Sequence, residues 1–388
     1  MTNLILADWH MVRVTVDGLG PFRQGKQSFE IFGADTDAPE SESRAPANIY
    51  MLLAANGFGK TTLLETIYGL YGLLNDRPSG RFAEGFYNSG AAQLDIVSHW
   101  TVDGRSETVL LSIWTGAEEP VDNLSEDDLD RLGSTTVWAK LGLSGNGSSV
   151  ERLSGTNELG IVFHEAIKQH LNEPPTKLFG NSQSMPTVLY FPADRRVVAP
   201  VRHEAVTRPD NWGYQPAVNF SSDGPEWGKS IDNVLVWLEW LAARDVDDID
   251  RRINDLLAFV NDLIFRDSPD KAILRPDREE LRSYVKTRFG LHPLSALSHG
   301  ERALLQILAR ILTHMTSNTV VLIDEIEIHL HVRWMDRMFE ALKELLRSYP
   351  AVTLIFTTHN LALIDTYRFE TKERGLVKGG YLIEADIL

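Results

Sequence analysis

The sequence predicts an α/β fold in which helices cover a largely parallel sheet, with an antiparallel β portion and an α-rich insert. Apolar residues 49–54 lead through a glycine-containing loop into residues 60–74, where apolar side chains recur at helical spacing. In the last third of the chain, helical segments alternate with short apolar strands, a pattern typical of parallel sheets. Near the N-terminus, residues 10–17 alternate apolar and polar side chains, which predicts a half-buried strand.

The segments next to this first strand are predicted to be a turn, a second strand and a loop. Residues 18–21 (Gly-Leu-Gly-Pro) predict the turn, and residues 27–32 the returning strand. Residues 34–46 are rich in Ala, Asp, Glu, Ser and Pro, which predicts a surface loop. Residues 93–114 predict a β-hairpin that turns at Asp103-Gly104.

The middle of the chain is predicted to be irregular at first and then helical. Residues 121–158 are acidic and then rich in Gly and Ser, so we expect no regular structure there, whereas residues 186–191 predict a strand. Apolar spacing over residues 229–265 predicts two helices that separate near residues 245–248, where Asp247 or Asp248 would cap the second one.

The last third is predicted to contain helices and strands in alternation. Its expected elements are helices at 301–315, 333–348 and 361–366, strands at 319–324 and 352–357, and a hairpin around 378–380.

Composition limits the classes of protein that fit. The 388 residues carry a net charge of −16, include no cysteine and contain no apolar run long enough to span a membrane. The first residues do not resemble a signal peptide, so we expect a cytoplasmic protein without a membrane partner. An acidic chain is not suited overall to coating DNA. The basic residues within 190–202 are either a local nucleic-acid patch or scattered surface charge.

Residues 54–62 (Ala-Ala-Asn-Gly-Phe-Gly-Lys-Thr-Thr) form a candidate phosphate loop between the predicted strand and helix. Gly57 and Gly59 allow a tight turn that aims backbone N–H groups at phosphate oxygens. Lys60 would reach the β- and γ-phosphates, and the Thr61 hydroxyl would bind Mg²⁺. Ala54 replaces the usual first glycine, which is acceptable if its φ is negative. The expected nucleotide contacts are Asn56, Gly57, Gly59, Lys60, Thr61 and Thr62.

A second candidate site follows the apolar residues 320–323, which end in Asp324-Glu325. Because parallel strands deliver their last residues to the ligand-binding edge of a sheet, Asp324 is placed to hold Mg²⁺ through a water. Glu325 is placed to orient or deprotonate an attacking water. The simpler interpretation is an apolar strand that ends in acidic residues without a function. The phosphate loop in the same chain makes this interpretation less favoured.

Three further runs complete a resemblance to the ABC-type ATPases. They are residues 297–301 (Leu-Ser-His-Gly-Glu), 322–331 (Leu-Ile-Asp-Glu-Ile-Glu-Ile-His-Leu-His) and 356–360 (Phe-Thr-Thr-His-Asn). Within that class the sequence is most similar to the RecF, SMC and OLD branch of the AAA family. The resemblance covers roughly residues 1–75 and 290–365, and implies a phosphate-loop NTPase fold with an ABC-type head.

The resemblance implies roles for particular residues. Ser298, Gly300 and Glu301 belong to the signature, in which Ser298 and Gly300 would contact the γ-phosphate of ATP held by a second subunit. His359 would be the switch histidine that binds the γ-phosphate. Together with Lys60 and Glu325, it completes the expected catalytic set, while Thr61 and Asp324 are the expected metal ligands.

Some residues keep more than one interpretation. His329 and His331 lie two positions apart and would either share a metal ion or, as in the family, stand beside the subunit interface. Glu327 is expected to support the site rather than to act in catalysis. For the family's glutamine loop, Gln183 precedes the predicted strand at 186–191 instead of following it, and Asp194 is a candidate replacement.

The family comparison suggests an ATPase head over residues 1–75 and 290–388, with residues 76–289 as a β-hairpin and α-helical insert. The chain shows no long heptad run, no cysteine pair and too few residues after His359 for a TOPRIM-type nuclease. We therefore expect Mg²⁺-dependent ATP hydrolysis in a homodimer that acts as a switch in phage defence or DNA maintenance and controls a separate effector protein. Alternatives are an ATP-binding scaffold for a protein assembly and, less in keeping with the motifs, a transporter ATPase subunit. A nucleic-acid partner stays open.

Overall fold

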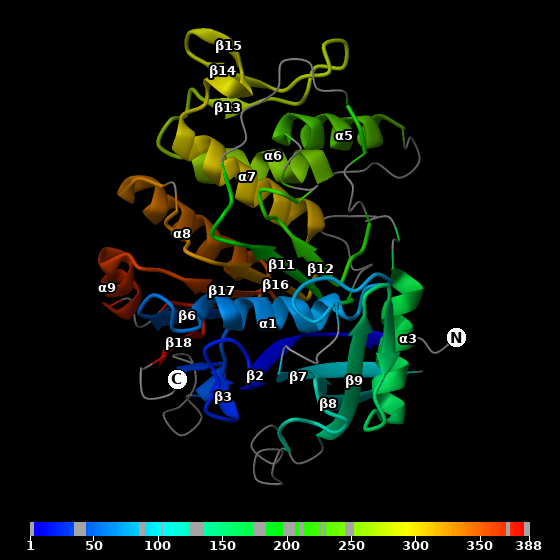
Figure 1. Cartoon of the computed structure of the whole chain (residues 1–388). Helices are drawn as coiled ribbons and strands as arrows, with labels where there is room; N and C mark the ends of the chain where they lie inside the picture. The colour runs from blue at the N-terminus through cyan, green and yellow to red at the C-terminus, as the bar shows by residue number, and fades with distance from the viewer. Residues whose placement is uncertain are drawn as a thin grey trace.

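Two stacked β-sheets with a helix between them organise the chain (Figure 1). The computed structural model describes residues 4–34, 44–84, 90–102, 104–123, 136–171, 173, 184–196, 206–208, 213–224, 227, 230–244, 252–328, 330–369 and 373–383. Helix α1 (Lys60–Gly72) lies between the sheets. Helices α7 (His299–His314) and α8 (Val332–Ser348) lie over the far face of one sheet. Helices α5 (Ile231–Arg244) and α6 (Arg252–Phe265) pack beyond α7, and α9 (Leu361–Phe369) lies at the edge.

The first sheet is mainly parallel and brings together strands that are far apart in the sequence. Its spatial order is β12 (Ala217–Asn219), β11 (Thr187–Phe191), β16 (Thr319–Ile323), β17 (Thr353–Thr357), β6 (Ile49–Ala54), β18 (Lys378–Ile383), β4 (Phe32–Ala34) and β5 (Arg44–Pro46). The strands from β12 to β18 pair in parallel, and β4 and β5 are antiparallel. The carboxyl ends of β11, β16, β17 and β6 therefore meet at one edge.

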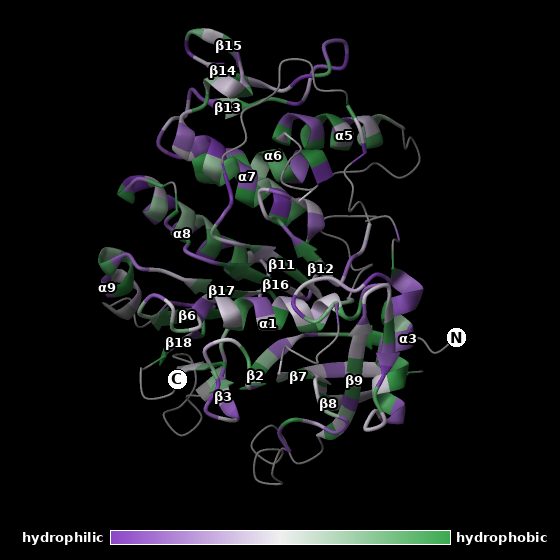
Figure 2. Cartoon of the chain, viewed as in Figure 1, coloured by the Kyte–Doolittle hydropathy of each residue, from purple (hydrophilic) through white to green (hydrophobic). Residues whose placement is uncertain are grey.

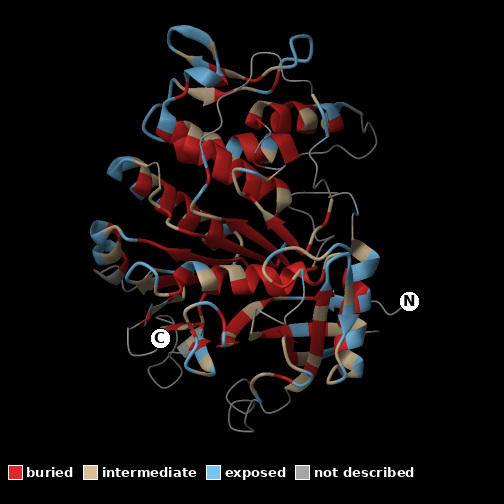
Figure 3. Ribbon diagram, viewed as in Figure 1, coloured by how far each residue is buried: buried red, intermediate tan, exposed pale blue. Residues whose placement is uncertain are grey.

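Both faces of this sheet are buried, which explains why its strands are continuous apolar runs. In β16, Val320 and Leu322 join the apolar cluster around α1, whereas Val321 and Ile323 join the cluster under α7 and α8. Figure 3 shows the central strands and most of α1 as buried, and Figure 2 shows these strands as mainly apolar. Strand β16 is thus packed on both of its faces, directly before Asp324.

The second sheet is mainly antiparallel and has the order β10 (Ser149–Arg152), β9 (Val137–Asn146), β8 (Arg105–Thr115), β7 (Ala91–Val102), β2 (His10–Asp17) and β3 (Gln27–Glu30), with β1 (Leu4–Leu6) beside β7. The pairing of β7 with β8 confirms the predicted hairpin. Helix α3 (Glu158–His170) packs on β9, and its Phe163 ring stacks on Trp9 and Trp100.

Three local predictions were wrong. Residues 137–152 are strands, because Ala139, Leu141 and Leu143 alternate on a buried face inside a stretch that looked Gly- and Ser-rich. The chain at 27–34 forms two strands, because it passes from one sheet to the other at Ile31. No hairpin turns at residues 378–380: β18 continues through them, and a Cβ at Gly379 would lie 2.4 Å from Phe32 O. The absence of a side chain at Gly379 thus allows β18 and β4 to lie close together.

Several expected elements lie partly outside the described residues. The loop at 34–46 is described only at its ends, where Arg44–Pro46 is the strand β5, and residues 245–248 between α5 and α6 are not described. The helices predicted between 229 and 265 and between 301 and 366 are confirmed. None of the described helices is long and apolar enough to cross a membrane.

A small third sheet precedes α7. It consists of β13 (Ala272–Ile273), β14 (Tyr284–Thr287) and β15 (Gly290–Pro293), and the short 3-10 turn η2 (Leu294–Ala296) connects it to the signature. Figure 3 shows the β14–β15 end of this sheet as exposed. Strands from residues 76–289 thus occur in all three sheets, paired in the two large ones with strands from the flanking segments.

Candidate functional site

The phosphate loop lies between β6 and α1, at the carboxyl edge of the parallel sheet. Gly57 and Gly59 have φ angles of 82° and 92°, a left-handed conformation that favours glycine. A Cβ at Gly59 would also lie 2.3 Å from the Phe22 ring, so only glycine fits there. Ala54 is a regular strand residue without a positive φ, which is why alanine is tolerated in place of the usual glycine.

Lys60 is the first residue of α1 and its side chain is largely buried. Its Nζ donates hydrogen bonds to Ala54 O at 2.7 Å and Ala55 O at 3.2 Å, and so lies over the loop. Burial lowers the pKa of Lys60, while Asp324, Glu325 and Glu327 oppose that shift. The cationic group therefore lies among the carboxylates of the second motif.

Asp324, directly after β16, is bound through its two carboxylate oxygens to helix α1 and to strand β17. Thr61 Oγ1 donates to Asp324 Oδ2 at 2.6 Å, and Thr357 Oγ1, at the end of β17, donates to Oδ1 at 2.6 Å. Asp324 is only 2% exposed. A hydroxyl and a carboxylate side by side are the kind of oxygen ligands that Mg²⁺ prefers, so these residues fit the cation that the motifs imply.

Glu325 has an unusual backbone. Its φ is 47°, which is disfavoured for a residue with a Cβ. Its backbone N–H donates to Thr357 Oγ1 at 2.7 Å, and one carboxylate oxygen lies 3.5 Å from His359 Nε2. The side chains of Glu325 and His359 are each about one-third exposed (35% and 36%), so both are open to a substrate.

Glu327 supports the segment that carries His359. One carboxylate oxygen accepts a hydrogen bond from the His359 backbone N–H. The other, Oε2, is buried and has no hydrogen-bond partner in the described part of the chain. Glu327 thus holds the backbone at His359 in place through this hydrogen bond.

Arg195, from the segment after β11, lies directly beneath the acidic strand end. The sequence suggested either a nucleic-acid patch or scattered surface charge here, but Arg195 is 3% exposed and belongs to neither. Its Nη1 donates to Asp324 O at 2.6 Å and its Nη2 to Glu325 O at 2.7 Å. The only available sequence signal was an arginine that follows an apolar strand.

The signature lies at the N-terminus of α7. Ser298 is the N-cap: its Oγ accepts from Glu301 N at 3.3 Å, and Glu301 Oε2 accepts from Ser298 N at 2.8 Å, which forms a capping box. A Cβ at Gly300 would lie 2.3 Å from the Trp334 ring. Among the described residues, no hydrogen bond or ion pair joins Ser298, Gly300 or Glu301 to the phosphate loop.

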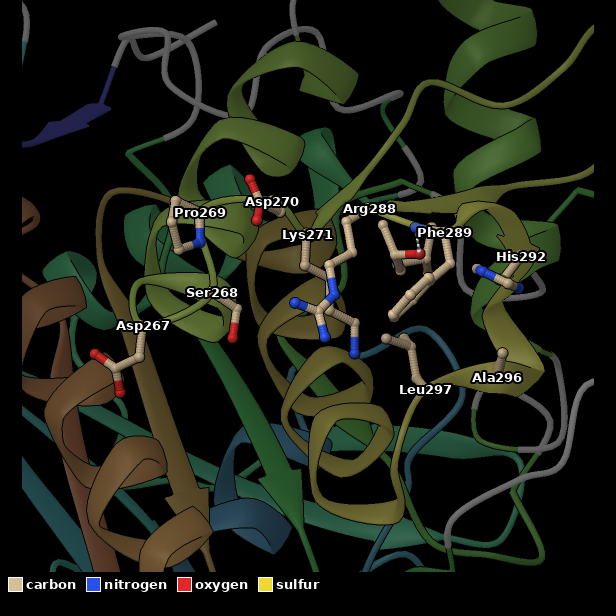
Figure 4. Close-up of a pocket in the computed structure, with 12 residues that line it drawn as sticks. Asp267, Ser268, Pro269, Asp270, Lys271, Arg288, Phe289, His292, Ala296 and Leu297 are labelled. Carbon is tan, nitrogen blue, oxygen red and sulfur yellow. Dashed lines mark hydrogen bonds between the residues drawn. The ribbon is translucent and has the colours of Figure 1, made fainter.

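A pocket of about 520 Å³ opens beside the signature and was not foreseen from the sequence. Figure 4 shows Lys271 and Arg288 extending into it, with Leu297, the residue before Ser298, on its wall. Lys271 Nζ also donates to Glu301 Oε1 at 2.7 Å. The capping box is therefore tied to the segment that leads into the third sheet.

The remaining candidates are placed as follows. Asn56 is exposed in the phosphate loop, and the Thr62 side chain packs near Gly20. Asp194 follows β11 and is exposed at the same sheet edge as Asp324, whereas Gln183 lies outside the described residues. His331 is exposed at the N-cap of α8, and its expected companion His329 is not described. Within the described chain, no cluster of three metal-ligating side chains occurs.

Comparison with known proteins adds a distant similarity. Residues 238–365 match a family described as "AAA domain, putative AbiEii toxin, Type IV TA system", a region that includes the signature, the acidic strand end and His359. No curated protein matches the chain.

Solved structures with a distant similarity to this chain include two SMC head domains and an ATP-binding cassette. The SMC head domain from Thermotoga maritima has a TM-score of 0.37 at 12% identity, over 92% of this chain and 91% of that one. An Smc head domain with an extended coiled coil, bound to the C-terminal domain of ScpA and derived from Pyrococcus furiosus, has the same values. A dimeric ATP-binding cassette bound to ADP and Pi has a TM-score of 0.30 at 11% identity, over 92% and 89%. The fold class, an α/β fold with a glycine loop between β6 and α1 and an antiparallel β portion, follows from the chain's own strand order and loop conformation.

Proposed function

We propose that two copies of this chain bind ATP between them and hydrolyse it to ADP and phosphate with Mg²⁺. The observation that carries the proposal is the hydrogen bond from Thr61 to Asp324, which joins the phosphate loop to the acidic strand end. The N–H groups of the loop and the Lys60 ammonium are suited to bind the phosphates. Thr61 and Asp324 would hold the cation, which when bound neutralises charge on the phosphate oxygens.

Hydrolysis needs a group that accepts a proton from water. Glu325 is the candidate, because its carboxylate is accessible and is held at the sheet edge beside His359. The water oxygen would bond to the γ-phosphorus as its proton passes to Glu325, and the bond from the γ-phosphorus to the bridging oxygen would break. His359 is placed to donate to the departing phosphate.

The dimer is supported by the position of the signature. Ser298 and Gly300 make no hydrogen bond to the phosphate loop of their own chain in the described residues, yet Ser298 begins a helix whose N-terminus favours anions. A second copy would bring these groups to the nucleotide. Turnover would then switch the dimer between open and closed forms and control a separate effector. The matched family's description as a toxin of a toxin–antitoxin system supports a defence setting for this switch.

The test combines turnover with sizing. We expect Mg²⁺-dependent phosphate release by the wild type and none above background by Lys60→Ala, which removes the phosphate-binding cation. Glu325→Gln keeps the shape of the side chain and removes the base, so ATP should hold it as a dimer on a sizing column. Wild-type phosphate release no greater than that of Lys60→Ala would exclude hydrolysis, and an ATP-independent mass of Glu325→Gln would exclude the sandwich.

A further inference from the structure

We propose that Arg195 is a positioning residue for ATP hydrolysis, because it holds the backbone of both Asp324 and Glu325 at the end of β16. The inference rests on the proposed function and adds a residue to it from a different part of the chain. Arg195 belongs to the segment after β11, which pairs in parallel with β16. It would act through the two acidic residues, whose backbone carbonyl groups it binds.

The hydrogen bonds of Arg195 converge on the turn that ends β16. Nη1 donates to Asp324 O at 2.6 Å and to Pro192 O at 2.8 Å, and Nη2 donates to Glu325 O at 2.7 Å. A planar guanidinium can serve two successive carbonyl groups at once, whereas a lysine ammonium cannot reproduce this fork. Arg195 therefore connects the ends of β11 and β16 through backbone carbonyl groups. A substitution of the side chain at 324 or 325 would leave these acceptors in place.

The backbone at Glu325 explains why such support is needed. A φ of 47° is disfavoured for glutamate and persists only where the surroundings hold it. Thr357 Oγ1 accepts from Glu325 N at 2.7 Å on one side, and Arg195 binds the Glu325 carbonyl on the other. The peptide units on both sides of Glu325 are thus fixed, and with them the direction of its carboxylate.

The Arg195 segment is itself anchored. Ser222 Oγ donates to Asp194 O at 2.5 Å and accepts from Arg196 N at 2.9 Å, and Trp227 Nε1 donates to Arg196 O at 2.5 Å. Burial lowers the pKa of Arg195 to about 10, against the opposing influence of Asp324, Glu327 and Glu325, so the guanidinium stays charged at neutral pH. It thereby also supplies positive charge beneath three carboxylates.

Arg310 offers a matched control. It is equally buried, at 2% exposure, and its guanidinium also donates to backbone carbonyls, those of Gln306 and Trp227. It lies in α7, and the carbonyl groups that it binds belong to α7 and to the segment before α5 rather than to the acidic strand end. Loss of a buried arginine fork at either position should lower the melting temperature. Arg310 also lies over the ring of Trp227, whose Nε1 binds Arg196 O, so the change at 310 should affect the reaction much less than the direct loss of the bonds from Arg195.

The experiment compares steady-state ATP hydrolysis by full-length wild type, Arg195→Lys and Arg310→Lys. We expect Arg195→Lys to lower kcat by about 10- to 100-fold with KM for ATP changed less than about twofold, because a supporting residue of this kind orients groups that act in the transition state. Arg310→Lys should keep KM and lower kcat far less than Arg195→Lys, because it reaches the Arg195 segment only through Trp227. Ser222→Ala, which loosens the segment without removing a charge, should give a smaller fall in kcat and covers the case in which Arg195→Lys does not fold.

The outcomes separate the two proposals. Wild-type turnover with an unchanged kcat in Arg195→Lys, or an equal loss in Arg310→Lys, overturns the role of Arg195 and leaves the proposed function intact. Wild-type turnover no greater than that of Lys60→Ala overturns the proposed function. In that case a crystal structure of Arg195→Lys decides the inference: a displaced Glu325 backbone supports it, and an unchanged left-handed φ overturns it.

Discussion

Thr61 Oγ1 donates a hydrogen bond of 2.6 Å to Asp324 Oδ2 across 263 positions of sequence. The bond joins the first turn of α1 to the end of β16, and Thr357 holds the second oxygen of the same carboxylate. The fold therefore holds side by side the two oxygen atoms that we propose as metal ligands.

Replacement of Asp324 by asparagine should disable the site without unfolding the chain. The amide removes the charge and leaves one of the two hydroxyl donors facing an NH₂ group, so we expect a stability loss of about 1–3 kcal/mol and a fall in turnover of about 100-fold. Magnesium titrations of turnover check this. Asp365→Asn, on the exposed side of α9, is the control and should behave as wild type. Equal Mg²⁺ dependence in Asp324→Asn and wild type would argue against a metal-binding role.

Two substitutions at Ser298 separate its capping role from phosphate binding. Ser298→Ala removes the N-cap of α7 and should lower the free energy of unfolding by about 0.5–2 kcal/mol. Ser298→Asp keeps a good N-cap, so stability should be retained, but its charge would repel the γ-phosphate of the partner's nucleotide. Denaturant titration and turnover are the measurements. An active Ser298→Asp variant would contradict the signature role.

Gly300→Ala should destabilise the contact between α7 and α8. The added Cβ would lie 2.3 Å from the Trp334 ring, so the ring or the helix must move, and overpacking of this kind costs about 1–3 kcal/mol. The double variant Gly300→Ala/Trp334→Ala should be more stable than the sum of the single effects, because the clash is absent. Additive effects in chemical denaturation would show that the ring does not limit this position.

Acidification should destabilise the protein through His164, which is 1% exposed on α3. Burial, assisted by the charges of Lys168 and Arg152, lowers the pKa of His164 from 6.5 to about 4. Between these values the unfolded chain binds the proton and the folded chain does not, so the free energy of unfolding falls as pH falls from about 6.5 to 4. The slope is up to about 1.4 kcal/mol per pH unit.

His164→Gln should remove this contribution to the slope, whereas His331→Gln, at an exposed histidine, should keep it. Urea titrations at pH 7.5, 6 and 5 on the three proteins give the comparison. Parallel pH profiles for wild type and His164→Gln would contradict the assignment.

Local pattern was sufficient for much of the fold. The strand–loop–helix unit around Lys60, the alternating segments after Glu301 and the β7–β8 hairpin were all predicted, because each has its own periodicity. The strands at 137–152 and 378–383 were not predicted, because Gly and Ser residues mask the alternation in the first and two glycines resemble a turn in the second. These glycines allow neighbouring segments to pack closely, and this role is visible only in the tertiary structure.

The sequence by itself determined the residue types of the candidate site: a glycine loop with a lysine, an acidic strand end, a signature before a helix and a histidine after a strand. Tertiary structure decided which residues support them. Thr357, Arg195 and Lys271 come from segments distant in sequence from the groups they hold, and reach them through parallel strand pairing and helix packing. A hydrogen bond between distant residues depends on the register of strands and the direction of side chains, and neither is encoded in the local spacing of a motif.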